Sequence, residues 1–219
     1  MKKEQIYQLL LCEKLIPVFY NSSVALSQQV LNASYNGGVR VFEFTNRGKN
    51  ALEIFKELIK YRNLHFPDLL MGAGTILNTD SAKAFIAAGA DFLVSPIFSN
   101  ELMIFAKENN IVWIPGCGTL TEIANADTSG CLLIKIFPGG TLGPNFVSAV
   151  LAPMPWLKLM PTGGVEPTEV NLSAWFKAGV SCVGMGSQLI TKEILEEQNF
   201  DQLQQKITNV LSIISQHKK

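Results

Sequence analysis

Residues 132–138 read Leu132-Leu133-Ile134-Lys135-Ile136-Phe137-Pro138, an apolar run that contains one lysine and ends at a proline. Apolar runs without alternating polar residues are typical of strands that are buried on both faces of a parallel sheet. Seven further runs have the same character: 15–20, 39–44, 69–73, 92–94, 111–114, 157–160 and 180–183. The sequence therefore predicts eight buried strands.

Segments with helical spacing separate these runs. Ala82, Phe85 and Ile86, for example, recur at intervals that place them on one side of a helix. Glycine accepts the left-handed backbone that turns a helix into the next strand, so we expect each helix to end at a glycine, as at 37–39, 89–90 and 179–180. Six apolar residues of the last segment form one stripe, which predicts an amphipathic closing helix: Phe200, Leu203, Ile207, Val210, Leu211 and Ile214.

Strands that alternate with helices predict a parallel sheet covered by helices, either a closed eight-stranded barrel or an open doubly wound sheet. Eight strand–helix units favour the barrel. The chain has 219 residues, which is within the range of a one-domain α/β barrel, and no linker interrupts it. We therefore predict a single (β/α)8 TIM barrel over residues 1–219, with an N-terminal helix and a C-terminal closing helix.

The composition argues against several classes of function. Basic and acidic residues balance at 18 each, and only the short Lys218-Lys219 tail is basic, so binding to nucleic acid is not expected. The four cysteines are scattered, as is typical of a reducing compartment, and no run is long enough to span a membrane. We expect a cytoplasmic protein. His65 and His217 lie far from other candidate ligands, which predicts solvated surface residues and no metal site.

In a barrel of this kind the reactive residues lie where the strands run into the following loops. The predicted strand ends are rich in polar residues and glycine: Glu43, Thr45 and Arg47; Gly72 to Thr75; Ser95-Pro96; Pro115-Gly116; Lys135; Pro161 to Gly164; and Gly184 to Ser187.

Lys135 is the most informative of these residues, because an ammonium group loses its proton more easily among apolar side chains and then becomes a nucleophile that can form a Schiff base. The alternative is a lysine that extends to water from the strand end. Lys158 also lies three residues before a proline in an apolar run. Position alone does not rank the two lysines: one is expected to project into a site, and the other to fill a barrel layer or to pair with a carboxylate.

Glu43 lies between Phe42 and Phe44, where a desolvated carboxyl group is suited to carrying protons in both directions. It could instead neutralise a buried cation. Arg47 offers a planar guanidinium that matches a carboxylate with two hydrogen bonds, although an exposed loop arginine fits the sequence as well.

Two glycine-rich loops follow the last two predicted strands. Thr162-Gly163-Gly164 and Gly184-Met185-Gly186-Ser187 occupy the positions where barrels often bind phosphate, and glycine lets backbone N–H groups approach an anion. One such loop is ordinary turn geometry, but two neighbouring loops favour a phosphate site.

Five motifs, in this order along the chain, resemble the 2-keto-3-deoxy-6-phosphogluconate aldolase family: 38–47 (GVRVFEFTNR), 72–78 (GAGTILN), 114–116 (IPG), 135–138 (KIFP) and 161–165 (PTGGV). The resemblance covers nearly the whole chain. It implies a class I aldolase on a (β/α)8 barrel, without metal or cofactor, which assembles as a homotrimer.

The resemblance also implies roles for individual residues. Lys135 matches the Schiff-base lysine and Glu43 the acid/base carboxylate, whereas Lys158 matches a structural position. The implied contacts of the pyruvyl carboxylate and pocket are Arg47, Thr75, Pro96 and Phe137, and the phosphate would rest on Thr162, Gly163, Gly164, Gly186 and Ser187.

The implied reaction cleaves a 2-keto-3-deoxy-6-phospho sugar acid to pyruvate and D-glyceraldehyde 3-phosphate, and the same site could cleave 4-hydroxy-2-oxoglutarate to pyruvate and glyoxylate. This chain has Gly139-Gly140 where family members often have Ala-Glu, and its Gly184-Met185-Gly186-Ser187 is closer to the phosphogalactonate branch. The alternatives are a phosphosugar epimerase or isomerase barrel and a non-catalytic barrel that binds a phosphorylated acid.

Overall fold

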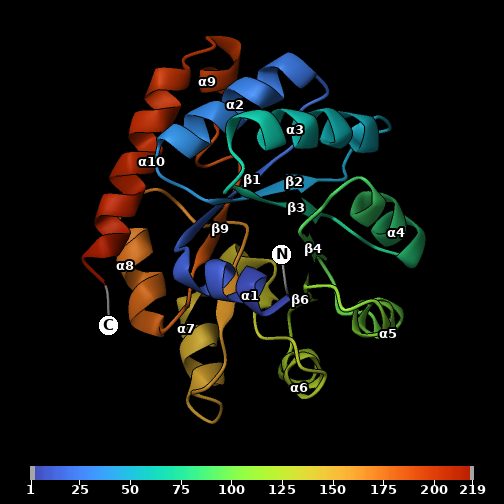
Figure 1. Cartoon of the computed structure of the whole chain (residues 1–219). Helices are drawn as coiled ribbons and strands as arrows, with labels where there is room; N and C mark the ends of the chain where they lie inside the picture. Colours follow the sequence, from blue (N-terminus) through green and yellow to red (C-terminus); the bar gives the residue numbers. More distant parts are fainter. Residues whose placement is uncertain (1–2, 218–219) are drawn as a thin grey trace.

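The protein is a ring of parallel strands surrounded by helices, as the computed structural model in Figure 1 shows. The structure describes residues 3–217, so the predicted basic pair Lys218-Lys219 lies outside the described residues. The strands are β1 (Leu15–Phe19), β2 (Val41–Thr45), β3 (Leu70–Gly74), β4 (Phe92–Val94), β5 (Trp113–Ile114), β6 (Gly116–Cys117), β7 (Ile134–Ile136), β8 (Leu159–Pro161) and β9 (Val183–Met185). The helices are α1 (Lys3–Cys12), α2 (Val24–Asn36), α3 (Ala51–His65), α4 (Thr79–Ala87), α5 (Asn100–Glu108), α6 (Leu120–Thr128), α7 (Gly139–Leu151), α8 (Glu169–Ala178), α9 (Lys192–Glu196) and α10 (Phe200–Ser215).

The strands form two sheets, in the orders β5-β4-β3-β2-β1-β9 and β6-β7-β8. The fifth predicted strand, 111–114, contains β5, which pairs with β4, and a further strand that was not predicted, β6, follows Pro115 and pairs with β7. The prediction that Pro115-Gly116 forms a strand end is wrong for Gly116. This residue belongs to β6, where it pairs with Lys135. At the opposite seam Thr162 forms a bridge with Gly184. The two sheets thus close into the predicted barrel.

The helix ends confirm the predicted glycine junctions only in part. Gly38, Gly89 and Gly179 have positive φ angles of 112°, 101° and 103°. The prediction that every helix ends at a glycine is wrong: α3 is followed by Phe66, and Asn110 takes the left-handed conformation after α5, with φ 53°. Asparagine is the residue that tolerates this region best after glycine.

Successive strand residues point alternately toward the helices and into the barrel. Outward residues such as Phe42 and Phe44 join the large core beneath the helices. Inward residues, most of them at or just before the start of a strand, form a second core with Leu10 of α1, which lies across the barrel in Figure 1 and seals its N-terminal mouth. This second core consists of Ile6, Tyr7, Leu10, Ile16, Val41, Leu70, Phe92, Val94, Val112, Ile114, Leu133, Met160 and Cys182.

The last helix carries the predicted stripe: Leu203, Ile207, Val210 and Ile214 are buried in α10. One prediction about the histidines is wrong. His65 is exposed, but His217 is half-buried, because its ring packs on Phe176 and bonds to the Ser173 hydroxyl at 2.9 Å. Across residues 3–217, no helix has both the length and the apolar character needed to span a bilayer.

Candidate active site

Glu43 and Lys135 lie together inside the barrel, one layer beyond the apolar core of its N-terminal end. β2 and β7 carry them at inward positions in the middle of each strand, two residues before the end of β2 and one residue before the end of β7. Glu43 Oε1 is 3.7 Å from Lys135 Nζ, and only 1% and 6% of the two side chains are exposed. The structure therefore places a buried amine beside a buried carboxylate, which excludes the interpretation of Lys135 as a lysine extended to water.

Glycines on neighbouring strands make room for these side chains. A Cβ atom on Gly74 would collide with Glu43 Oε1, and one on Gly72 would collide with the ring of Phe92. Gly74 therefore lies directly against the carboxylate, while Gly72 lies against the apolar core. The two glycines of β3 mark the boundary between the apolar and the charged layers.

The Glu43 carboxylate is not bonded as a structural ion pair would be. Both of its oxygens are buried and have no hydrogen-bond partner among the described residues, and 3.7 Å is too long for a hydrogen bond to Lys135. Asp91 shows the contrast, because it accepts from Arg62 at 2.9 Å and from the Met71 N–H at 2.8 Å. Buried polar atoms are normally bonded, so both Glu43 oxygens remain available to accept hydrogen bonds from a ligand.

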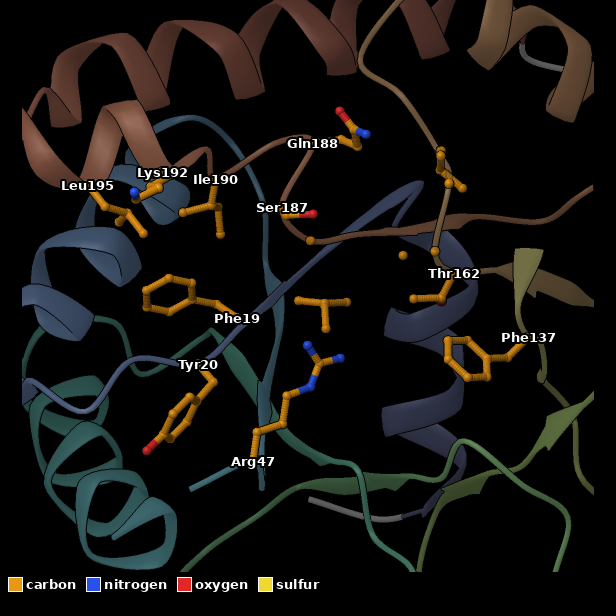
Figure 2. Close-up of a pocket in the computed structure, with 16 residues that line it drawn as sticks. Phe19, Tyr20, Arg47, Phe137, Thr162, Ser187, Gln188, Ile190, Lys192 and Leu195 are labelled. Atoms are coloured by element: carbon orange, nitrogen blue, oxygen red, sulfur yellow. The ribbon is translucent and has the colours of Figure 1, made fainter. Parts of the chain in front are cut away.

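A cavity of about 470 Å³ opens above this layer at the C-terminal ends of the strands (Figure 2). Its walls come from the ends of β1 and β9, from the segments that follow β1, β2, β7, β8 and β9, and from α9. The lining residues are Val18, Phe19, Tyr20, Arg47, Phe137, Thr162, Gly163, Gly164, Val165, Gly184, Gly186, Ser187, Gln188, Ile190, Lys192 and Leu195.

The charges around this cavity are all positive. Arg47 and Lys192 line it, and no lining residue is acidic. Lys192 lies 3.2 Å from Glu196 on the exposed face of α9, whereas the Arg47 guanidinium makes no side-chain bond to any residue between 3 and 217 and points into the cavity in Figure 2. The cavity is therefore suited to an anionic ligand that would meet an unpaired guanidinium.

The structure brings seven of the predicted site residues to the cavity wall: Arg47, Phe137, Thr162, Gly163, Gly164, Gly186 and Ser187. Lys135 and Glu43 lie deeper, with Lys135 Nζ 5.3 Å from the centre of the Phe137 ring. Thr75 and Pro96 do not line this cavity. Thr75 follows β3 with a left-handed φ of 59°, and the backbone of Pro96 packs closely on Gly116.

Some lining residues escaped the sequence analysis. Phe19 and Tyr20 end the first strand, and the rule that strand ends face the site would have found them. Ile190, Lys192 and Leu195 belong to α9 and the turn before it. No local signal in the sequence indicates that this short helix folds over the barrel mouth.

The geometry also separates the two candidate lysines. Lys158 precedes β8, so it lies at the N-terminal end of the barrel, and its side chain is exposed beside a small hollow that Lys14 and His217 also line. The prediction that the second lysine fills a barrel layer is wrong, and among residues 3–217 Lys158 has no carboxylate partner. Within the same described range, no three His, Cys, Asp or Glu side chains are grouped as metal ligands.

The model of one protein family, described as KDPG and KHG aldolase, matches residues 6–206. The chain belongs to this aldolase family. A relative from Pseudoalteromonas atlantica, a 2-dehydro-3-deoxy-phosphogluconate aldolase, is 30% identical over 86% of this chain and 85% of its own length. A 2-dehydro-3-deoxy-6-phosphogalactonate aldolase from Escherichia coli is 35% identical over 55% of this chain and 58% of its own length.

Among solved structures, the KDPG aldolase of Legionella pneumophila is similar to this aldolase, with a TM-score of 0.84 and 28% identity over 92% of this chain and 96% of the other. That crystal structure holds pyruvate as a covalent carbinolamine intermediate. The similarity confirms the predicted TIM-barrel fold and the predicted family.

Proposed function

We propose that this protein is a class I aldolase that reversibly cleaves a 2-keto-3-deoxy-6-phospho sugar acid to pyruvate and D-glyceraldehyde 3-phosphate. The observation that carries the proposal is the Lys135–Glu43 pair, buried and 3.7 Å apart beneath a cavity without acidic residues. Family membership supports the reaction type.

In the first step the Lys135 amine attacks the C2 ketone to form a carbinolamine, which loses water to give an iminium ion. The iminium ion accepts the electron pair of the C3–C4 bond as that bond breaks. The covalent pyruvate carbinolamine of the Legionella pneumophila relative supports this sequence of steps.

Glu43 moves the protons. Its carboxylate, whose two oxygens have no hydrogen-bond partner among residues 3–217, takes the proton of the C4 hydroxyl through a water molecule, and the aldehyde leaves. The resulting enamine on Lys135 receives that proton at C3. Hydrolysis of the regenerated iminium ion then releases pyruvate and restores the amine.

The remaining predicted residues hold the two ends of the substrate. Arg47 and Thr75 bind the carboxylate of the pyruvyl group, and Pro96 and Phe137 pack against it. The unpaired guanidinium of Arg47, which points into the cavity, supports this assignment. The phosphate rests on Thr162, Gly163, Gly164, Gly186 and Ser187, whose loops form one wall of the cavity.

The pyruvyl half of the substrate undergoes all of the chemistry, so we include 4-hydroxy-2-oxoglutarate as a second substrate, cleaved to pyruvate and glyoxylate. The family name, which includes KHG aldolase, supports this. The proposed substrates include both configurations at C4, that of the phosphogluconate type and that of the phosphogalactonate type. A phosphosugar epimerase or a purely binding barrel is less well supported, since neither needs a buried lysine beside an unbonded carboxylate.

Borohydride reduction tests the proposal. Reduction in the presence of pyruvate should fix one pyruvyl group on Lys135, detected by peptide mass spectrometry, and Lys135→Met should lose both the adduct and aldol activity. Lys158→Met is the matched control, because it removes a lysine from the opposite end of the barrel. An unmodified Lys135, or full aldol activity in Lys135→Met, would refute the proposal.

We further propose that the aldolase is a cytoplasmic homotrimer. Three large apolar side chains are about half exposed: Leu77 and Ile97, on the loops after β3 and β4, at 51% and 46%, and Leu120, the first residue of α6, at 50%. A face of this kind is suited to contact with another copy of the chain. Light scattering on the purified protein should give three times the 24.0 kDa chain mass, and a monomer would contradict the assignment.

A further inference from the structure

The guanidinium of Arg47 points into the cavity, and its direction depends on how the backbone beneath it is held, because no group in the described range 3–217 bonds to it. Two hydrogen bonds fix the chain on the β2 side. The Asn46 N–H donates to the Gly74 carbonyl at 2.8 Å, and the Arg47 N–H donates to the Thr45 carbonyl at 3.0 Å. A side chain on a loose backbone loses more conformational freedom when a ligand binds. What holds the chain after Arg47 therefore affects how well it binds an anion.

Tyr20, the residue directly after β1, covers the residue that follows Arg47. A Cβ atom on Gly48 would collide with Oη and Cζ of Tyr20 and would lie 3.1 Å from its Cε1. The edge of the phenol ring thus lies directly against the Gly48 backbone. The φ angle of Gly48 is outside the left-handed region, so its backbone could carry a side chain. The Tyr20 ring occupies the space that this side chain would need.

The Tyr20 ring is itself held in place. It is half-buried, and its centre lies 5.7 Å from that of the Phe44 ring, which is completely buried beneath the helices. The end of β1 is also bonded to β2, since the Thr45 hydroxyl donates to the Phe19 carbonyl at 3.4 Å. In Figure 2 the Tyr20 hydroxyl points away from the Arg47 guanidinium. The phenol ring is therefore placed to support the loop and not to bond to the guanidinium.

We propose that Tyr20 is a positioning residue for the carboxylate of the pyruvyl group. By packing on Gly48 it holds the loop that carries Arg47, and so it sets the direction of the guanidinium. The inference rests on the proposed function, which gives Arg47 this carboxylate to bind, and adds a residue that acts through Arg47. The effect of Tyr20 on pyruvate binding should therefore disappear when the guanidinium is absent.

Borohydride trapping of pyruvate on Lys135 measures this binding. The pyruvate concentration that gives the half-maximal initial rate of trapping should rise about tenfold in Tyr20→Ala, the lower end of the cost of a lost hydrogen bond to a charged group. The KM for the phosphorylated keto acid should rise with it. The kcat should stay within about threefold, because the interaction is lost equally from the bound substrate and the transition state. Tyr20→Phe keeps the ring and should recover most of the loss.

A double-mutant cycle separates this role from a general structural one. Arg47→Met alone should raise the half-maximal pyruvate concentration by more than Tyr20→Ala does. Adding Tyr20→Ala to Arg47→Met should raise it further by less than about twofold, because the effects of residues that act through one another are not additive. An equal rise in the wild-type and the Arg47→Met backgrounds would overturn the inference.

Gly48 offers a second test of the same contact. Gly48→Ala places a methyl group where the Tyr20 hydroxyl lies, so it should displace the ring and weaken pyruvate binding, as Tyr20→Ala does. In Tyr20→Ala this space is empty, so the double variant Tyr20→Ala/Gly48→Ala should bind pyruvate no more weakly than Tyr20→Ala alone. Multiplied losses in the double variant, or wild-type binding in Gly48→Ala, would contradict the positioning role.

Tyr35→Ala is the control for the loss of an aromatic ring. Tyr35 is also half-buried, its ring stacks on Phe66 with centres 4.3 Å apart, and it does not line the cavity. This variant should lower the melting temperature without changing the pyruvate dependence, and an equal rise in Tyr35→Ala and Tyr20→Ala would refute the inference. If the proposed function itself is wrong, the wild-type protein forms no borohydride adduct. An adduct with the same pyruvate dependence in wild type and Tyr20→Ala refutes only the role of Tyr20.

Discussion

The two ends of the barrel are filled by opposite kinds of side chain. At the N-terminal end, inward residues such as Val41 and Leu70 form an apolar core that α1 seals. Two residues further along the same strands lie Glu43 and Gly72. The Glu43 carboxylate lies beside Lys135 in this second layer, and the open cavity lies above it. The character of the interior thus changes over about 7 Å of strand. The same strands provide stability at one end and chemistry at the other, so substitutions should separate the two properties.

The largest effect is expected at the charged end. Lys135→Met should lower aldol activity by at least about 10³-fold, because it removes the nucleophile. It also leaves Glu43 buried without its cation, which should destabilise the fold by about 3–5 kcal/mol if the carboxylate stays charged. Pyruvate release and urea unfolding measure the two effects. Adding Glu43→Gln to Lys135→Met should restore part of the stability, and a double variant less stable than the single one would contradict this account.

At the sealed end, Leu10→Ala should have the reverse profile. Leu10 is completely buried where α1 meets the inward residues, so its truncation should cost about 2–5 kcal/mol of unfolding free energy. The kcat and KM of the folded protein should stay within about twofold of wild type. A loss of kcat at unchanged stability would mean that the two ends are coupled.

The boundary between the ends can be tested on one strand. Gly74→Ala should lower kcat by about 10²-fold, the cost of displacing a catalytic group by about 1 Å, because the new Cβ would meet the Glu43 carboxylate. Gly72→Ala is the matched control. Its Cβ would meet the Phe92 ring, so it should cost about 1–3 kcal/mol of stability and largely preserve kcat. The distinction fails if both variants lose kcat equally.

The smallest effect, counted per pH unit, concerns the sealed end. Burial raises the pKa of the Cys182 thiol to about 12, from an ordinary value of 9.0. The neutral thiol is favoured in the folded state, so its contribution to stability is complete below pH 9 and is lost as pH rises from 9 to 12, by at most about 1.4 kcal/mol per pH unit. The free energy of unfolding, measured with urea at pH 8 to 11, should fall less steeply with pH for Cys182→Ala than for wild type. Identical slopes would contradict the raised pKa.

The sequence predicted the barrel well because its strands are buried on both sides, and apolar runs reveal burial. Apolar runs do not reveal where strand pairing begins. Val180 starts a predicted strand and is buried, yet β9 begins only at Val183. The choice between Lys135 and Lys158 depended on such boundaries. Both lie three residues before a proline, but Lys135 lies within β7 and Lys158 lies before β8, so they lie at opposite ends of the barrel.

The parts of the site that the sequence did not predict arise from tertiary contacts. The fit of Gly139 and Gly140 against the loop after β8 joins two segments that are remote in the chain, and nothing local distinguishes these glycines from turn residues. The same holds for Lys192 and Leu195, which reach the cavity because α9 folds over its mouth. Thr75 and Pro96 were among the predicted strand-end residues, but their contacts with the pyruvyl group were implied by the family resemblance alone, and they lie outside the wall of the described cavity.

The bridge between Thr162 and Gly184, together with the hydrogen bond from the Ser181 N–H to the Leu159 carbonyl at 2.9 Å, joins β8 to the β9 segment, while β2 and β3 share five residue pairs. The two glycine-rich loops leave the barrel on either side of this narrow join. A phosphate bound to the N–H groups of both loops would connect the two strands at this point. An occupied site should therefore stabilise the closed barrel, and an empty site should allow larger local motion between β8 and β9. Release of the product would then weaken the contact between β8 and β9. Protection of the β9 amides from hydrogen exchange would report the occupancy of the site.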